Sequence, residues 1–148
     1  MSKTEIKFRL MRPADLDEVL AIEEKSFQHP WPRELFEYEI TSDYFCYLVG
    51  TINNKIVAYI GANLSYGTME VVNLAVEPSM RRCGIGEEIF SNLIDGLKKS
   101  KVTNELWLHV RKSNLAAIKL YEKLGFAHVA TEKYYYYDED GLVMRKIL

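Results

Sequence analysis

Apolar side chains recur along the chain at two spacings, and each spacing predicts one kind of element. Residues 16–27, 33–40, 85–97 and 114–124 repeat them every three or four positions, which is typical of amphipathic helices. Shorter runs, continuous or alternating, predict β-strands at residues 7–10, 45–52, 55–64, 71–76, 105–110, 126–133 and 142–147. The element order predicts an α/β chain of the α+β kind, with a mixed seven-stranded sheet and about four helices.

The connections between the strands predict how the sheet is ordered. Asn53-Asn54 suits a tight hairpin turn with positive φ, and a second turn is expected at residues 65–68. The second, third and fourth strands should therefore form an antiparallel meander. A full helix separates the fourth strand from the fifth, so we expect these two strands to run parallel in an otherwise largely antiparallel sheet.

Residues 69–98 predict a strand, a glycine loop and a helix in succession. Pro78 cannot donate to a strand ladder, so the strand should end before it. After the loop, an apolar stripe predicts a helix whose buried face comprises Ile85, Ile89, Phe90, Leu93, Ile94 and Leu97. Unpaired N–H groups in the first turn of a helix attract anions, and the arginines and glycines just before it suit a phosphate. These residues, Arg81, Arg82, Gly84 and Gly86, are a candidate diphosphate cradle.

Two common phosphate-binding motifs are excluded for this loop. No Gly-Lys-Ser/Thr sequence follows it, so it is not a Walker loop. Ile89 stands where the dinucleotide-binding fingerprint needs a third glycine. An ordinary helix start with glycines in its turn remains an alternative.

Length and composition limit the class of protein. A chain of 148 residues matches one domain, residues 1–148, and its 48% apolar and 27% charged residues are typical of a folded globule. The net charge of -2 argues against a nucleic-acid partner. No apolar run is long enough to span a membrane and the first ten residues are too polar for a signal peptide, so we expect a cytoplasmic protein that does not bind membranes.

The two cysteines do not indicate a metal or redox site. Cys46 and Cys83 lack the spacing of metal ligands or of a redox pair, so no metal is expected. Cys46 lies in a predicted strand and should be a buried small hydrophobe. Cys83 lies in the glycine loop, where a helix start can lower a thiol pKa, but no partner base is apparent.

Two more segments could carry functional side chains. The strand at residues 105–110 should place Leu106, Leu108 and Val110 on one face, and Trp107, His109 and Arg111 on the other. The prolines of His29-Pro30-Trp31-Pro32 must end a helix and make a short, rigid connection. Phe27, Pro30 and Trp31 then either wall a substrate groove or pack on the core, and both interpretations stay open.

Four blocks together resemble one family. They are Asn73-Leu74-Ala75-Val76-x-Pro78, Arg81-x-x-Gly84-x-Gly86, the run from Leu108-His109-Val110-Arg111 through Ser113-Asn114 and Tyr121 to Gly125-Phe126, and Tyr135-Tyr136 with Glu139-Asp140. The chain resembles the RimI-like protein N-terminal acetyltransferases of the GNAT superfamily over nearly its whole length. The resemblance implies the GNAT fold, in which strands four and five splay apart around the pantetheine arm of acetyl-CoA.

The resemblance also implies how the cofactor is bound. Backbone groups of Leu74, Ala75 and Val76 would pair with the pantetheine, and Asn114 would contact the cofactor. The diphosphate would lie on Arg81, Arg82, Cys83, Gly84, Ile85 and Gly86. Tyr121 matches the family tyrosine beside the thioester sulfur, where its hydroxyl could protonate the departing thiolate. Its pattern alone also fits a core aromatic.

The expected base departs from the bacterial pattern. Bacterial members of the group carry glutamate where this chain has His109, whereas some eukaryotic members have histidine there. Imidazole suits a general base near neutral pH. Glu70, at the start of the fourth strand, resembles the carboxylate base of other GNAT enzymes, so the two could share proton removal. A solvated Glu70 and a hydrogen-bonded sheet histidine are the alternatives.

The expected substrate is a protein N-terminus, with a ribosomal protein as one candidate target. Tyr135 and Tyr136 match family residues that bind the peptide backbone, and with Phe27, Pro30 and Trp31 they would wall a narrow slot. We expect direct acetyl transfer to the α-amino group. The alternatives are acetylation of a lysine side chain or small-molecule amine, and a noncatalytic coenzyme A-binding module. The sequence does not predict the oligomeric state.

Overall fold

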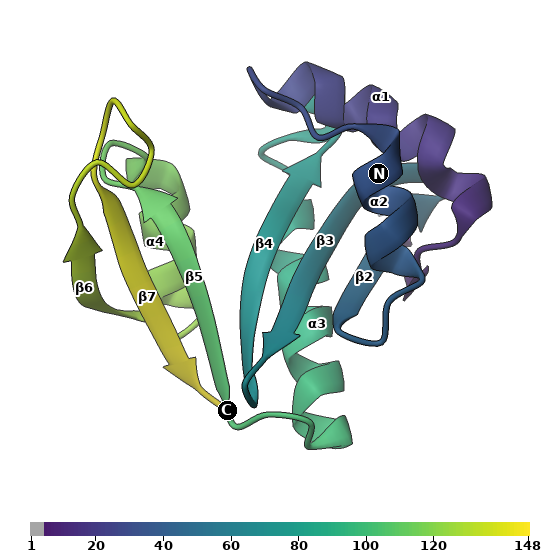
Figure 1. The fold of residues 1–148 in the computed structure, drawn as a ribbon. Coiled ribbons are helices and arrows are strands. Elements are labelled where there is room, and N and C mark those ends of the chain that lie inside the picture. Colours follow the sequence, from purple (N-terminus) through teal and green to yellow (C-terminus); the bar gives the residue numbers. More distant parts are fainter. Residues whose placement is uncertain (1–4) are drawn as a thin grey trace.

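The computed structural model describes residues 5–148, which form a seven-stranded mixed sheet with helices on both faces (Figure 1). The strands lie in the order β1-β2-β3-β4-β5-β7-β6. Their bounds are β1 Lys7–Leu10, β2 Phe45–Ile52, β3 Lys55–Ser65, β4 Thr68–Val76, β5 Glu105–Arg111, β6 Ala127–Glu132 and β7 Gly141–Ile147. All seven predicted strands are confirmed, with small differences at their ends.

The predicted connections are confirmed as well. Asn53 and Asn54 both have positive φ, at 51° and 65°, in the turn between β2 and β3. Strands β2, β3 and β4 pair antiparallel in sequence, while β4 and β5 are parallel. β7 then inserts between β5 and β6, so that β6 is an outer strand.

Four α-helices accompany the sheet: α1 Leu16–Ser26, α2 Arg33–Ile40, α3 Ile85–Ser100 and α4 Leu115–Lys123. α1 ends one residue before Phe27, which lies in the connection to α2. Within residues 5–148, none of the helices combines the length and the apolar character needed to cross a membrane.

Two apolar cores lie on opposite sides of the sheet. All six predicted stripe residues of α3 are buried in the first core, and α4 packs its apolar side chains against the same core. The second core joins α1 and α2 to β2 and β3, through buried residues such as Leu16, Phe36 and Tyr59. Figure 1 shows α3 and α4 behind the sheet.

β4 and β5 separate shortly after they begin to pair. Their ladder joins only Met69 to Leu106, Glu70 to Trp107 and Val71 to Leu108. We call the point after Val71 and Leu108 the fork. Beyond the fork the two strands diverge (Figure 1), which confirms the predicted splay.

A β-bulge at Val72 accompanies the fork. On β3, Gly61 pairs with Asn73 and the next residue, Ala62, pairs with Val71, so Val72 is an extra residue in β4. A bulge bends its strand and increases the twist. It also resets the alternation of faces, because Val71 lies in the first core whereas Ala75 lies in the second. The bulge therefore turns the end of β4 away from β5.

Candidate active site

A cavity of about 580 Å³ lies between the end of β4, the start of α3 and α4. It is lined by all but one of the residues expected at the cofactor: Leu74, Ala75, Val76, Arg81, Arg82, Gly84, Ile85, Gly86, Asn114 and Tyr121. Cys83 is the exception, an exposed residue whose thiol lies 3.6 Å from the Arg81 carbonyl. The volume suits a small-molecule site.

The glycine loop has a backbone that fits a phosphate group. Gly84 has a φ of +80° directly before α3, a conformation that side chains disfavour. The first bond within α3 runs from the Glu88 N–H to the Gly84 carbonyl, at 3.1 Å, so the earlier amides have no partner inside the helix. A Cβ on Gly86 would meet only Val76, at an ordinary 3.7 Å. The protein itself leaves this side of Gly86 open, as a diphosphate against the backbone requires.

Arg81 ties the loop to its neighbours. Its guanidinium donates to the Val76 carbonyl at 3.2 Å and to the Ser26 hydroxyl at 3.1 Å. A guanidinium has five N–H groups, so donors remain for an anion. Arg82 is exposed and has a positive φ of 62°. Asn114 caps α4, since its Oδ1 accepts the Ala117 N–H at 3.2 Å.

Tyr121 projects from α4 into this cavity and also packs on the core. Its ring lies edge-on to Phe90, with centroids 5.8 Å apart, and 6.1 Å from Phe126. Burial raises the pKa of Tyr121, so its hydroxyl stays protonated at neutral pH. The two expectations for Tyr121, core aromatic and proton donor, are compatible in this position.

Glu70 and His109 meet at the fork. Nδ1 of His109 lies 2.8 Å from a carboxylate oxygen of Glu70. Nε2 lies 3.1 Å from a carboxylate oxygen of Glu132 on β6, a residue that the sequence did not indicate. Tyr135 stacks on the imidazole with centroids 4.1 Å apart and planes at 4°. Residues 5–148 contain no set of histidine, cysteine and acidic side chains arranged to hold a metal ion.

The two tyrosines expected at the substrate lie together beside this group. Tyr136 is edge-on to Tyr135 at 4.8 Å, and the Arg111 guanidinium lies 4.5 Å from the Tyr136 ring. Burial is the main cause that raises the pKa of Tyr136 to about 12, and burial together with nearby Glu70 and Glu132 raises that of Tyr135. Both phenols therefore remain neutral hydrogen-bonding groups.

The three candidate residues in the connection between α1 and α2 lie in different environments. Phe27 is exposed and lines the cavity. Trp31 is half-buried in the second core, with its ring 6.0 Å from Phe36, and Pro30 is exposed. The structure thus supports the core interpretation for Trp31, while Phe27 stands at the cavity.

Glu23 holds the connection between α1 and α2 in place, a role that its position in a helical pattern did not predict. Its buried carboxylate accepts the Trp31 N–H at 2.9 Å, the Asn73 amide at 3.1 Å and the Tyr59 hydroxyl. Asn73 follows the bulge of β4, so Glu23 links the connection to the strand beside the cofactor cavity. Three donors on one carboxylate offset the cost of burying its charge.

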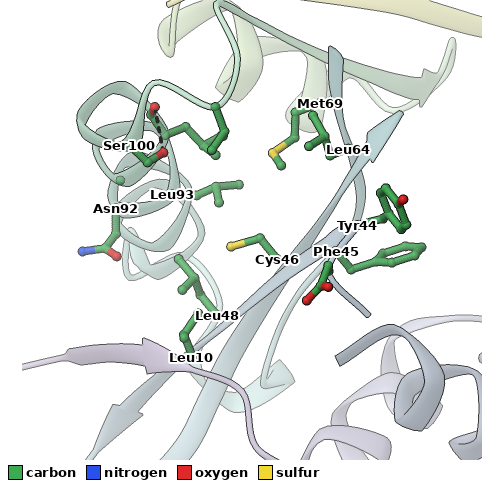
Figure 2. Close-up of a pocket in the computed structure, with 14 residues that line it drawn as sticks. Leu10, Tyr44, Phe45, Cys46, Leu48, Leu64, Met69, Asn92, Leu93 and Ser100 are labelled. Carbon is green, nitrogen blue, oxygen red and sulfur yellow. Dashed lines mark hydrogen bonds between the residues drawn. The ribbon is translucent and has the colours of Figure 1, made fainter. Parts of the chain in front are cut away.

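A second, apolar cavity of about 380 Å³ lies away from these groups, between α3 and β2 (Figure 2). Figure 2 shows the sulfur atoms of Cys46 and Met69 beside this cavity. Cys46 is half-buried rather than fully buried as expected, because it lines this cavity. Burial raises the pKa of its thiol, which disfavours the nucleophilic thiolate.

Comparison with known proteins identifies the family. Residues 16–126 match the model of the acetyltransferase (GNAT) family. The [ribosomal protein bS18]-alanine N-acetyltransferase of Escherichia coli is 34% identical over 131 residues, which are 88% of this chain and 87% of that protein. An N-alpha-acetyltransferase of Sulfurisphaera tokodaii is 29% identical over 153 residues, covering 95% of this chain and 92% of its own.

A solved structure agrees with this assignment. The crystal structure of the ribosomal-protein-S18-alanine N-acetyltransferase from Escherichia coli superposes with a TM-score of 0.89 and 31% identity, over 97% of this chain and 94% of that one. The chain belongs to the GNAT acetyltransferase family, whose members use acetyl-CoA. It resembles in particular the RimI-like and archaeal N-terminal acetyltransferases.

Proposed function

We propose that this enzyme transfers the acetyl group of acetyl-CoA to the α-amino group of a protein N-terminus by direct attack. The observation that carries the proposal is the 2.8 Å contact between His109 and Glu70 at the fork. These two residues lie directly beside Leu108 and Val71, the last pair in the ladder that joins β5 to β4. This pair would accept a proton where β4 and β5 separate, and the residues of β4 beyond the fork line the cavity that would hold the cofactor. The names of the relatives from Escherichia coli and Sulfurisphaera tokodaii support the same reaction.

The cavity residues would hold the cofactor. Acetyl-CoA supplies an acetyl group activated as a thioester. The amides at the start of α3, with Arg81 and Arg82, would bind its diphosphate, and the backbone of β4 beyond the bulge would bind the pantetheine arm. Cys83 would contribute its amide alone, since it does not line the cavity and its thiol lies 3.6 Å from the Arg81 carbonyl.

Three side chains would move protons. An α-amino group has a pKa near 8, so most of it arrives as ammonium and must lose a proton before it attacks. Glu70 and His109 would take that proton. Tyr121, whose hydroxyl burial keeps protonated, would donate a proton to the departing thiolate.

The energy needed to deprotonate the substrate amine favours an N-terminus over a lysine side chain. Lysine has a pKa near 10.4, so freeing its amine costs about 2.5 pKa units, or roughly 3 kcal/mol, more than freeing an α-amino group. Tyr135 and Tyr136 would bind the first residues of the peptide, with Phe27 and Pro30 on the other wall and Trp31 supporting that wall from the core. The name of the Escherichia coli relative makes the alanine N-terminus of a ribosomal protein the first target to test.

Mass spectrometry of acetylated peptides tests the proposal. The purified protein is incubated with acetyl-CoA and a peptide library that varies the first two residues and includes alanine first. A matched peptide with a blocked N-terminus and an internal lysine is the control. We expect acetyl transfer to free α-amino groups only. Transfer to lysine alone contradicts the proposal, and calorimetric binding of acetyl-CoA without any transfer indicates a noncatalytic module.

A further inference from the structure

Glu132 contacts the imidazole of His109 on the ring nitrogen opposite to Glu70. It lies at the end of β6, two strands away from β5 in the sheet (Figure 1). Its Oε1 is 3.1 Å from Nε2 of His109, while Oε1 of Glu70 is 2.8 Å from Nδ1. Both ring nitrogens therefore face a carboxylate.

A neutral imidazole cannot donate to both carboxylates. It has one N–H donor and one lone pair, whereas the protonated ring has two donors. While the ring is neutral, one of the two contacts therefore lacks a proton. A proton that passes from the substrate ammonium through Glu70 to Nδ1 completes the second hydrogen bond.

Among the groups around the ring that the following contacts describe, Glu132 is the charged side chain beside Nε2. β7 presents Val143 opposite His109, and Tyr135 covers one ring face as a neutral phenol. On β5, Arg111 is engaged with Asp138 at 2.9 Å and Glu139 at 3.2 Å. The side chain of His109 is only 19% exposed, so water does not replace these contacts freely.

We propose that Glu132 is a positioning residue for His109. It holds the imidazole with Nδ1 toward Glu70, and it stabilises the protonated ring that forms when the substrate ammonium loses its proton. In that step an N–H bond of the ammonium breaks, its electron pair stays on the substrate nitrogen, and an N–H bond forms on the ring, which later returns the proton to water. Orientation of an imidazole by a carboxylate has the same effect in Ser-His-Asp enzymes. The inference rests on the proposed function.

Two substitutions separate this role from a structural one. The Glu132 side chain is 52% exposed on an outer strand, so Glu132→Ala and Glu132→Gln are expected to fold. Alanine removes the acceptor and the charge, whereas glutamine keeps a neutral acceptor for the Nε2 proton. We expect kcat/KM for the peptide to fall roughly 10- to 100-fold with alanine and less with glutamine, through kcat. The peptide KM and the Kd for acetyl-CoA should not change. Asp95→Ala, which removes an exposed carboxylate from α3, is the charge-matched control and should keep the wild-type rate.

The ring proton on Nε2 gives a readout that does not depend on acetyl transfer. In the wild-type protein labelled with ¹⁵N-histidine, the hydrogen bond to Glu132 should slow its exchange with water, and Glu132→Ala should abolish this protection. The His109 signals are assigned with His109→Ala.

Two results overturn the inference. One is an alanine variant with kcat/KM within about twofold of wild type and unchanged exchange at Nε2. The other is a loss confined to the peptide KM, which would place Glu132 on the substrate. A wild-type protein that acetylates no peptide overturns the proposed function instead, and the exchange measurement still tests the contact between Glu132 and His109.

Discussion

The two sides of the fork are built from different parts of the chain. On the proposed cofactor side, the cavity is lined by consecutive residues of the bulged end of β4, the loop at Gly84 and the first turn of α3, whose main-chain groups would bind the cofactor. On the proposed acid–base side, four side chains from different strands meet: Glu70 from β4, His109 from β5, Glu132 from β6 and Tyr135 from the loop after β6.

This difference predicts how each side responds to substitution. A main-chain site depends on a backbone conformation, so it should tolerate most side-chain changes and fail where a glycine is replaced. A side-chain site depends on the register of distant strands and on single atoms. Substitutions on the acid–base side should therefore change turnover and leave cofactor binding intact, while substitutions that alter the backbone on the cofactor side should do the reverse.

His109→Ala should give the largest effect. Loss of a general base lowers rates by about 10²- to 10⁴-fold, so we expect a loss of this size in kcat/KM for the peptide, with an unchanged Kd for acetyl-CoA. Steady-state kinetics and calorimetry measure the two quantities. His128→Ala is the matched control, because His128 is an exposed sheet histidine that bonds Thr131 at 2.9 Å and lies outside the site. If His109→Ala weakened acetyl-CoA binding as much as it lowered kcat/KM, the two sides of the fork would not be functionally separate.

Tyr121→Phe should have the next largest effect, as the one side-chain hydroxyl that would act on the cofactor side. We expect turnover to fall about 10- to 100-fold, with little change in stability because the ring keeps its contacts with Phe90 and Phe126. Burial raises the pKa of Tyr121, so the hydroxyl stays protonated as the pH rises. The ratio of wild-type to variant rates should therefore stay constant between about pH 7 and pH 9. A ratio that shrinks toward alkaline pH would mean that the phenol ionises in this range.

Gly84→Ala should mainly weaken cofactor binding. An alanine at positive φ costs about 1–2 kcal/mol, and relief of this strain would move the amides at the start of α3. We expect the Kd for acetyl-CoA to rise roughly 5- to 30-fold. Gly67→Ala is a close control, since Gly67 has a φ of 79° in the turn before β4 and, like Gly84, no atom near an added Cβ. Both variants should lose similar stability by thermal unfolding, and Gly67→Ala should leave the Kd unchanged. Equal effects on the Kd would contradict a main-chain cofactor site.

The main-chain side of the site was largely predictable from the sequence. Pro78 and the glycines at 84 and 86 mark local backbone events, and the apolar stripe of α3 follows within the next turns. Local signals of this kind do not depend on how distant segments pack together. The bulge at Val72 was not predictable, because the run from residue 71 to 76 has apolar residues on both faces and contains no glycine.

On the acid–base side, only the residues that match the family's motifs were predictable from the sequence. Glu70 and His109 were expected to cooperate, and their side chains meet. Glu132 was missed because its contact depends on β7 lying between β5 and β6, an order that no local pattern encodes. Glu23 was missed for a similar reason, since its partners Trp31, Tyr59 and Asn73 come from three other segments.

Gly141→Ala should have the smallest effect and tests the acid–base side at a position without a functional side chain. Gly141 begins β7 and pairs with Arg111 on β5 and Glu132 on β6. A Cβ there would lie 2.9 Å from Cβ of Tyr135 and 3.0 Å from its ring atoms, so Tyr135 must shift. The shift should disturb its stacking on His109. We expect kcat/KM for the peptide to fall about 3- to 10-fold, the scale of one aromatic contact of roughly 0.5–1.5 kcal/mol, with an unchanged Kd for acetyl-CoA.

A double-substitution cycle shows whether Gly141 acts through Tyr135. Tyr135→Ala removes both the stacking ring and the ring atoms that an added methyl group would meet. If the glycine matters because it leaves room for Tyr135, Gly141→Ala should cost little further kcat/KM in the Tyr135→Ala background. If the two losses add in full, Gly141→Ala acts through the backbone of β7 and not through Tyr135. The stacking of Tyr135 on His109 would then not explain why the acid–base side is sensitive at Gly141.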